Sequence, residues 1–407
     1  MPNELVEIGF DLVLPEGPFF TLDDPVKGQL DNTEYPLAGF QYYDITEYVT
    51  DVTVQRGKSD YIDNISSGEL VVTLNNQNRY FDPLYASSPF YGNILPKRVV
   101  RYSVDGVQAY QGVIDDWDLQ YSVNGEATAT FIASDGFVYL NNQTLANGTA
   151  TAQLSGARVN AILDDQFVQW PTDNRDIDTG TATFGADVIP ENQNVLEYLQ
   201  KAELSELGLL YISKTGQLVF RDRSHAPATT GLVHFSDDGT GIGYNDMLIG
   251  YGSENLVNEI VASSIITTTE LTATDENSQA EYGIFNETYT DLLLSTDAQV
   301  ENFAVTLIAK YSQPVYRFKE IQVLLNDLDF ADAQALLNLE LGDFVQVTFT
   351  PSGVPPAITR YAQIIRLTHN VTVSGEHYMT FGLDSLNFTY LVLDDEVFGR
   401  LDEGSLA

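Results

Sequence analysis

The sequence predicts a mainly β protein with two small antiparallel β-barrels, related by an internal repeat and carrying α+β insertions. Three observations lead to this fold class. Short apolar segments alternate with polar residues at a period of two, as in strands with one buried face. Glycine-containing dipeptides typical of hairpin turns separate these segments. One hairpin pattern occurs twice, around Gly125 and again around Gly375, which is an offset of 250 residues.

The composition limits the possible functions. The 407 residues are enough for several domains, and 43% hydrophobic residues suffice for packed cores. The chain has 19 Lys and Arg against 58 Asp and Glu, a formal net charge of −39, which disfavours nucleic acid as a bound ligand. The absence of cysteine removes disulfides and thiolate metal sites and suits assembly in a reducing cytoplasm.

Neither a signal peptide nor a membrane span is expected. The first ten residues contain Glu4 and Glu7 and lack a basic region and a long apolar run. Charged residues interrupt every apolar stretch before the roughly 20 residues that a spanning helix needs. Residues 1–39 contain five prolines and little periodicity, which predicts an extended N-terminal arm.

The first barrel is predicted at residues 40–145. After Arg56-Gly57 and a polar loop, a strand at 69–74 alternates apolar and outward residues. Asn75-Asn76 follows this strand, and Pro83 prevents further ladder donation. Two hairpins are then expected. The first has its turn at Asp105-Gly106, between strands 99–104 and 107–114. The second has its turn at Asn124-Gly125, between strands 119–123 and 127–132.

An α+β insertion is predicted at residues 146–228. Its first helix is expected to run from a Ser155 cap through Gln169. The apolar face of that helix is Val159, Ile162, Leu163 and Phe167. A second helix carries Val195, Leu199 and Ala202 on one face, with Gly208 as its C′ residue. A hairpin of strands 209–212 and 218–220 ends the insertion.

The second barrel is predicted from two parts, 229–265 and 315–387, on either side of an insertion at 266–314, and residues 388–407 form an acidic C-terminal tail. Strands are expected at 232–235 and 256–261, and from Tyr316 onward the chain is expected to hold only strands and turns. The insertion contains a helix at 297–311 with Thr296 as its cap. The apolar face of this helix is Val300, Phe303, Ala304, Leu307, Ile308 and Tyr311.

The repeat aligns residues 123–131 with residues 373–381 without a gap. Both copies have a Gly-Glu turn and end in threonine followed by phenylalanine. Upstream apolar positions match as well: Ile114, Trp117, Tyr121 and Val123 correspond to Ile364, Leu367, Val371 and Val373. The alternative explanation is a chance likeness between hairpins with Gly-Glu turns.

No catalytic, cofactor or metal site is predicted. The acidic pairs Asp115-Asp116, Asp164-Asp165 and Asp394-Asp395 could be offered as glycosidase carboxylates, but such pairs are expected among 58 acids, and a solvated surface role is favoured. The four histidines form no H-E-x-x-H motif, G-x-S-x-G is absent, and no amphipathic helix follows the glycines at 239–243. Asp237, Asp238 and Asp246 could hold calcium, although their spacing is not that of an EF-hand.

The order of motifs around the first strands resembles that of tailed-bacteriophage minor tail proteins of the baseplate or tail-tip hub family. The order is strand, Arg56-Gly57, loop, Ser-Gly turn, strand, Asn75-Asn76 and aromatic-Asp-Pro. Residues 280–284, the helix end at 309–311 and residues 339–348 follow the family order further along. The resemblance covers about residues 40–386, and the collinear order of the pieces is its basis.

In hubs of this type, the resemblance implies, one chain carries two similar barrels and three chains form a six-barrel ring on the hexameric end of the tail tube. It implies a homotrimeric virion protein of the tail tip, assembled in the host cytoplasm and without enzymatic activity. The implied partners are distal tail or tube proteins and receptor-binding or fibre proteins, with genomic DNA passing through without specific binding. The alternatives are a carbohydrate-binding receptor protein, suggested by 23 tyrosines, and a cell-wall hydrolase.

Two matching segments near the ends of the chain are predicted to be partner-docking tags. Both are polar and place small apolar anchors around a glycine, which suits addition to a groove or sheet edge of another protein. The matched residues are Leu22, Asp23, Asp24, Val26, Gly28, Leu30 and Asp31, and Leu393, Asp394, Asp395, Val397, Gly399, Leu401 and Asp402. The alternative is a flexible acidic tail with a chance match.

Overall fold

The computed structural model describes residues 2–10, 41–58, 64–123, 125–225 and 232–385. The chain divides into two compact units. Unit 1 comprises residues 1–54, 69–135 and 369–377, and unit 2 comprises residues 55–68, 136–368 and 378–407. Strands predominate in the described residues and most strand pairs are antiparallel, so the prediction of a mainly β protein is confirmed.

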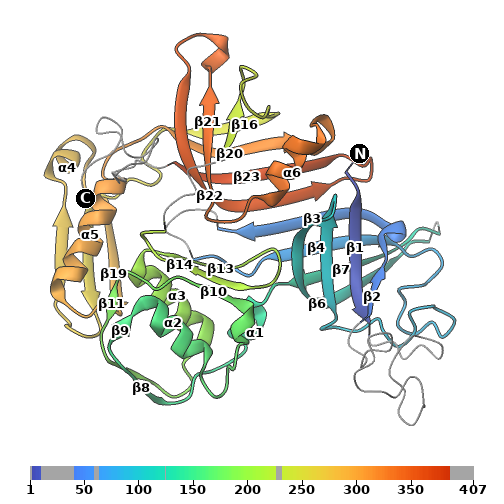
Figure 1. Ribbon diagram of the computed structural model, residues 1–407, viewed down its shortest axis with the longest axis horizontal. Helices are drawn as coiled ribbons and strands as arrows, with labels where there is room; N and C mark the ends of the chain where they lie inside the picture. Colours follow the sequence, from blue (N-terminus) through green and yellow to red (C-terminus); the bar gives the residue numbers. More distant parts are fainter. Residues whose placement is uncertain (1, 11–40, 59–63, 124, 226–231, 386–407) are drawn as a thin grey trace. The chain divides into compact units, whose positions relative to one another are not determined.

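Unit 1 contains a sheet with the strand order β3-β4-β7-β6-β5-β1-β2 (Figure 1). Leu70, Val72 and Leu74 of β4 are fully buried, as their alternation with outward-facing residues predicted. The elements of this unit are β1 (Glu4–Phe10), β2 (Gln41–Asp44), a 3-10 turn (Thr46–Tyr48), β3 (Val49–Gly57), β4 (Glu69–Asn75), β5 (Val99–Val104), β6 (Val107–Tyr121) and β7 (Ala127–Ser134), and residues 55–57 at the end of β3 belong to unit 2.

The turn between β5 and β6 has the predicted conformation. Asp105 and Gly106 have φ angles of 46° and 81°, and a type I′ turn requires positive values at both positions. The prediction of separate strands at 107–114 and 119–123 is wrong, because β6 continues from Val107 to Tyr121. Its pairing with β7 shifts between Ile114 and Asp116, and this bulge bends one strand where the sequence suggested two.

The predicted N-terminal arm is wrong for its first residues. β1 lies between β5 and β2 and is antiparallel to both. Val6, Ile8 and Phe10 are fully buried and alternate with Glu7 and Gly9, which is the strand pattern that the many prolines of residues 1–39 obscured. The remainder of the predicted arm, residues 11–39, lies outside the described residues.

Unit 2 contains the strand order β16-β20-β23-β22, with β21 antiparallel beside β22 and β15 parallel beside β21. These strands are β15 (Val233–Ser236), β16 (Asp246–Gly250), β20 (Arg317–Leu324), β21 (Phe344–Phe349), β22 (Ile358–Val371) and β23 (His377–Ser385), of which residues 369–371 and His377 belong to unit 1. Two 3-10 turns (Leu325–Asp327 and Pro351–Gly353) and α6 (Phe330–Asn338) connect them.

Helix α6 corrects the expectation of only strands and turns after Tyr316. The Asp329 side chain accepts a hydrogen bond from the Asp332 amide at 2.9 Å and so caps the helix. Ala333, Leu336 and Leu337 form its buried face. This short pattern of a cap followed by an apolar face was present in the sequence and was missed.

Within unit 2, the region of the predicted α+β insertion contains a three-stranded sheet β10-β14-β13 beside helices α2 and α3 (Figure 1). Its helices are α1 (Phe137–Asn141), α2 (Ser155–Leu163), a 3-10 turn (Thr172–Asn174) and α3 (Val195–Glu206). Its strands are β8 (Gly148–Ala150), β9 (Gln153–Leu154), β10 (Arg175–Ile177), β11 (Thr183–Phe184), β12 (Asp187–Ile189), β13 (Leu209–Ile212) and β14 (Leu218–Arg221).

Both helix ends predicted in this insertion need correction. Helix α2 ends at Leu163 rather than Gln169, and Phe167 is 61% exposed. Its end is fixed by the Arg175 side chain, which donates to the Leu163 carbonyl at 3.2 Å. Ser155 is not the cap, because it is already the first helical residue. Helix α3 ends on a left-handed Leu207 (φ 54°), so Gly208 is not the left-handed residue that was expected.

Another three-stranded sheet of unit 2, with the order β18-β17-β19, packs against helix α5. The elements are β17 (Glu259–Ser264), β18 (Leu271–Thr274), α4 (Glu276–Tyr282), β19 (Asn286–Leu292) and α5 (Asp297–Tyr311). The bounds of α5, its Thr296 cap and its buried face all agree with the prediction. The strand predicted at 256–261 begins at Glu259 and belongs to this sheet, so it does not join β15 and β21 as the second barrel required.

The two large strand sets share one connectivity. The order β3-β4-β7-β6-β5 of the first corresponds to β16-β20-β23-β22-β21 of the second. The turns of the β6–β7 and β22–β23 hairpins also form the same hydrogen bonds. The Ser122 amide donates to the Glu126 carbonyl at 2.8 Å, and the Thr372 amide donates to the Glu376 carbonyl at 3.0 Å. Gly125 and Gly375 have φ angles of 93° and 81°.

Candidate functional site

The chain after β4, which carries the motif Asn75–Asp82, folds into a tight connection within unit 1. The Asn76 amide donates to the Ala127 carbonyl at 2.9 Å, and its side-chain oxygen accepts from the Phe81 amide at 3.0 Å. These bonds turn the fully buried Phe81 ring into the core, where it stacks on Phe90 and Trp117 at centroid distances of 5.3 and 6.1 Å. The motif therefore specifies a rigid loop.

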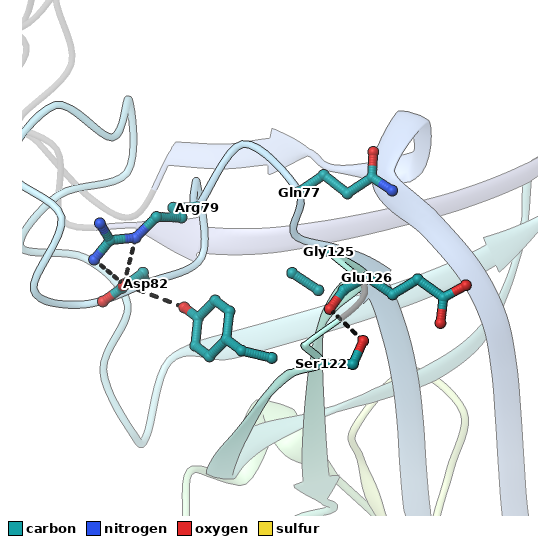
Figure 2. A pocket seen from close by; sticks show the side chains of 8 residues that line it. Gln77, Arg79, Asp82, Ser122, Gly125 and Glu126 are labelled. Carbon is teal, nitrogen blue, oxygen red and sulfur yellow. Dashed lines mark hydrogen bonds and ion pairs between the residues drawn. The ribbon is translucent and has the colours of Figure 1, made fainter.

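Asp82 lines a pocket of about 420 Å³ beside this loop (Figure 2). Its Oδ2 atom accepts from Arg79 Nη2 at 2.6 Å and from the Tyr121 hydroxyl at 3.1 Å. Its Oδ1 atom accepts from the Leu84 amide at 2.9 Å. Hydrogen bonds from Arg79 first, and then from Leu84, hold the pKa of Asp82 below its ordinary value.

Arg56 of the Arg-Gly motif forms a buried junction within unit 2. Its side chain is 4% exposed, and Nη2 donates to Glu340 Oε1 and to the Ile212 carbonyl, both at 2.7 Å. The other Glu340 carboxylate oxygen accepts from the Lys214 amide at 2.9 Å. The junction thus joins two segments on which the family resemblance depends, Arg56-Gly57 and residues 339–348, although 284 positions separate Arg56 from Glu340.

Gly57 permits this junction because no other residue fits its place. Its φ angle is +105°, and a Cβ atom would lie 2.1 Å from the Ile365 carbonyl oxygen. The next amide, that of Lys58, donates to the same Ile365 oxygen at 2.8 Å. The Arg-Gly pair therefore combines a buried cation with a close backbone contact, and both roles are structural.

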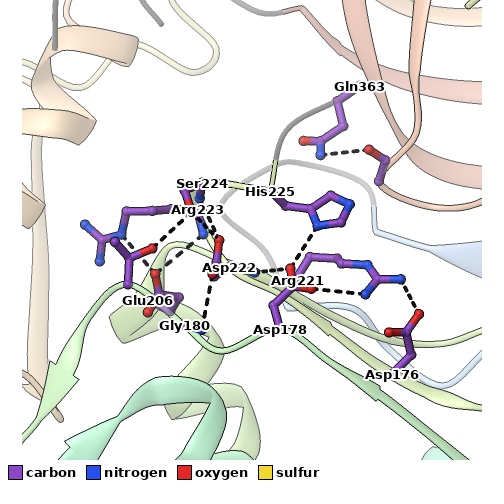
Figure 3. Close-up of polar contacts among 12 residues, drawn as sticks. Asp176, Asp178, Gly180, Glu206, Arg221, Asp222, Arg223, Ser224, His225 and Gln363 are labelled. Atoms are coloured by element: carbon purple, nitrogen blue, oxygen red, sulfur yellow. Dashed lines mark hydrogen bonds and ion pairs between the residues drawn. The ribbon is translucent and has the colours of Figure 1, made fainter. Parts of the chain in front are cut away.

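A second polar cluster joins β10, β14 and the chain after β14 (Figure 3). Asp178 accepts from Arg221 Nη1 at 3.3 Å and from the Asp222 amide at 3.1 Å, and His225 Nδ1 lies 2.9 Å from its Oδ2 atom. Glu206 of α3 is fully buried and accepts from Arg223 Nε at 3.1 Å. Every carboxylate in this cluster is engaged by a cation or an amide, as in a structural network rather than an acid-base pair.

A buried cluster of hydrogen-bonded side chains around Glu4 was not predicted from the sequence. His377 Nδ1 lies 2.8 Å from Glu4 Oε1, and His369 Nδ1 lies 3.0 Å from His377 Nε2. The Tyr102 hydroxyl donates to the other Glu4 oxygen. Burial first, and then the Glu4 charge, raise the pKa of Tyr102 well above its ordinary value. No local motif predicts the cluster, because Glu4 and His377 are 373 positions apart.

Several of the acidic residues considered as catalytic carboxylates or calcium ligands have hydrogen-bond or ion-pair partners. Asp115 pairs with Lys97, and Asp164 pairs with Arg175 at 2.9 Å. In the loop after β15, Asp237 accepts from the Thr350 amide at 2.7 Å and Asp238 from the Thr240 amide at 2.9 Å. The described residues contain no group of three His, Cys, Asp or Glu side chains that could hold a metal ion.

The predicted docking tags, Leu22–Asp31 and Leu393–Asp402, lie outside the described residues, as does the acidic pair Asp394-Asp395. In the part of the chain that the structure describes, the helices are all too short or too polar to cross a membrane.

Comparisons with known proteins place this fold. No protein-family model and no curated protein matches the chain. A tail protein from Neisseria meningitidis MC58 aligns over 85% of this chain and 94% of its own, with a TM-score of 0.57 and 12% identity. The 43 kDa tail protein of prophage MuSo2 from Shewanella oneidensis aligns over 84% and 93%, with a TM-score of 0.56 and 15% identity.

A chain of the Francisella PdpA–VgrG complex aligns over 94% of this protein but only 53% of its own length, with a TM-score of 0.50 and 10% identity. The two tail proteins match along nearly their whole length, so the similarity extends over the succession of sheets and insertions and is not confined to one sheet. The resemblance to phage tail proteins is therefore confirmed at the level of the fold: this chain has the fold of the Neisseria and Shewanella tail proteins.

Proposed function

We propose that the protein is a structural hub of a bacteriophage tail tip or baseplate, without enzymatic activity, which assembles as a homotrimer. The repeated connectivity is the observation that carries this proposal. Five strands in one order occur twice, and the hairpins β6–β7 and β22–β23 have the same turn hydrogen bonds 250 positions apart. The shared fold with phage tail proteins supports the same assignment.

The repeat has a specific use in such an assembly. A threefold object can match a sixfold surface only if each chain presents two similar surfaces. Two barrels per chain, built on the two strand sets, would give six equivalent positions in a ring of three chains. The ring would dock on the hexameric end of a tail tube and hold receptor-binding or fibre proteins at the virion tip.

The measurement that tests the hub proposal is the mass of the assembled protein. Native mass spectrometry should give three times the chain mass of 45.0 kDa, and electron microscopy should show a threefold particle with six similar lobes. A protein that stays monomeric at high concentration, or a sixfold ring of single chains, would contradict the proposal.

The charge fits passage of DNA through the ring. With a net charge of −39, the chain repels phosphates at short range, so a lumen lined by it would release a genome without binding it. Lysine and arginine concentrated on the wall of the channel would contradict this role despite the overall charge.

The two terminal segments are proposed as docking tags for another component of the tail tip. A synthetic peptide of residues 393–402 should compete with the 22–31 copy for one site on its partner. Removal of residues 388–407 should leave the trimer intact but prevent recruitment of that component. Complete virions assembled after both segments had been scrambled would exclude the tags.

A further inference from the structure

We propose that the pocket between the β4–β5 connection and the β6–β7 hairpin is a binding site for a neutral carbohydrate, with a pyranose ring against the Tyr121 side chain. The proposal does not rest on the hub function, since it concerns one pocket within unit 1. The side chains that line it and carry the argument are those of Gln77, Arg79, Asp82, Tyr121 and Glu126.

The size of the pocket and its aromatic wall suit a sugar. Its volume of about 420 Å³ lies within the roughly 300–1,000 Å³ of sites that bind small molecules. Tyr121 is 51% exposed, yet its hydroxyl is held by Asp82 at 3.1 Å. Asp82 is itself held by Arg79 and the Leu84 amide. An aromatic face that is exposed but already fixed offers the apolar side of a pyranose ring a surface that needs no ordering on binding.

The polar groups around this face favour hydroxyls over ions. Figure 2 shows Arg79 and Asp82 on one side and Gln77 and Glu126 on the other. Arg79 supplies donors, Glu126 supplies acceptors, and the Gln77 amide supplies both. An anion would meet the Glu126 carboxylate and a cation would meet the Arg79 guanidinium. A hydroxyl both donates and accepts, so a sugar with several hydroxyls can form hydrogen bonds with each of these side chains without repulsion.

These groups remain open to a ligand. Among the described residues, no side-chain hydrogen bond or ion pair engages the Glu126 carboxylate or the Gln77 amide. The Arg79 side chain is 52% exposed even with its bond to Asp82. The pocket therefore offers unused donors and acceptors beside a fixed ring, and this combination is what binding of a small neutral polyol needs.

The second hairpin provides a built-in comparison. At the matching offset of 250, Val371 replaces Tyr121 and is 9% exposed, so the aromatic wall is missing there. The carboxylate of Glu376, which corresponds to Glu126, accepts from Ser374 Oγ at 3.3 Å. The two hairpins thus share a turn but not the aromatic side chain, and Glu376 is a matched control position for Glu126.

Saturation-transfer difference NMR on the full-length protein would test the site with millimolar methyl glycosides of glucose, galactose, mannose and N-acetylglucosamine. At least one glycoside should show transfer to ring protons, and Tyr121→Ala should weaken its affinity about tenfold. Tyr121→Phe should retain most binding, since the ring remains. Glu126→Gln should weaken binding at an exposed position where misfolding is not expected, whereas Glu376→Gln should leave it unchanged.

The same experiment includes the competing ligand classes, with methylguanidinium as the cation and acetate as the anion. The proposal would be overturned if none of the four glycosides showed saturation transfer. So would glycoside binding that is insensitive to both Tyr121→Ala and Glu126→Gln, or methylguanidinium or acetate binding more tightly than every sugar. A monomeric mass would contradict the hub function and would leave these outcomes unaffected.

Discussion

Gly57 is the residue at which side-chain size should matter most. Gly57→Ala places a methyl group in a left-handed conformation and against the Ile365 carbonyl oxygen, 2.1 Å away. Strain and displacement together should lower the free energy of unfolding by about 2–4 kcal/mol, as read from urea denaturation. Gly106→Ala is the matched control, because Gly106 also has positive φ (81°) but nothing within 4 Å of the added atom. It should cost about 1 kcal/mol; equal losses at both positions would show that the close contact adds nothing.

Glu203 should make stability depend on pH. It is buried in α3, where its carboxylate accepts from the Leu210 amide at 3.1 Å. Burial raises its pKa from the ordinary 4.5 to about 7, against the opposing effects of Lys58 and Leu210. The folded chain therefore holds a proton that the unfolded chain has lost, so the contribution of Glu203 to stability falls as pH rises from about 4.5 to about 7.

Glu203→Gln removes this titration. Between pH 5 and 7, the unfolding free energy of the wild type should therefore fall by about 2–3 kcal/mol relative to that of the variant. Urea denaturation at several pH values measures it, and the difference from wild type cancels the other acidic groups. Glu197→Gln, on the exposed side of the same helix, should leave the dependence unchanged. Parallel curves for wild type and Glu203→Gln would mean that Glu203 is ionised throughout.

For single residues, the sequence indicated which positions are structurally important, but not which residues they contact. Arg56, Gly57 and the motif Asn75–Asp82 were singled out correctly, because their local pattern is distinctive. Their contacts were not predictable, since Glu340 lies 284 positions beyond Arg56 and nothing local couples them. The pocket beside Asp82 was missed for the same reason: Tyr121 comes from the far end of a strand that the sequence divided in two.

The C-terminal carbonyls of helix α6 accept hydrogen bonds from Lys214, a side chain outside the helix, and the stability of the protein should depend on these bonds. Lys214 Nζ donates to the carbonyls of Leu337, Asn338 and Leu339 at 2.8, 2.9 and 3.3 Å. Leu337 and Asn338 are the last residues of α6 and Leu339 is its C-cap, so their carbonyls have no partner within the helix itself. Lys214→Met should therefore lower the urea midpoint by an amount equivalent to about 1–2 kcal/mol.

The control for Lys214 is Lys201→Met, on α3, where the lysine makes no ion pair with a described residue. It should change the midpoint little. Lys214→Arg tests whether charge alone suffices, and partial retention is expected because the guanidinium is longer and planar. A loss as large in Lys201→Met as in Lys214→Met would contradict the capping role.

Elements with both a cap and a long apolar face were predicted correctly, and shorter ones were not. Helix α5 has Thr296 as its cap and six buried residues on one face, so its bounds follow from local sequence. Helix α6 has three buried residues in nine, too few for periodicity to distinguish it from a strand and turn. Helix α2 continued beyond Leu163 in the prediction because Phe167 matched its face, whereas Arg175 of β10, 12 residues after Leu163, ends it.

For the whole molecule, charge is the property that the sequence predicts most directly, because the net charge of −39 follows from composition alone. The strand order can be known only from the structure. The sequence indicated the repeat through one hairpin, and only pairing distinguishes β17, which joins a separate sheet, from β15 and β16. Burial patterns indicate that a strand has an inner face, but not which neighbour it pairs with.

Excess negative charge should make both folding and assembly depend on salt. Repulsion among acidic groups destabilises the compact state. Salt screens this repulsion, and the screening length falls from about 30 Å at 0.01 M salt to about 8 Å at physiological ionic strength. Raising sodium chloride from about 0.01 M to about 0.15 M should therefore raise the urea midpoint and, by native mass spectrometry or light scattering, shift monomers toward trimers. Sucrose at equal osmolality separates screening from solvent exclusion. A midpoint that falls with salt would mean that ion pairs such as Arg56–Glu340 outweigh the repulsion among the excess acids.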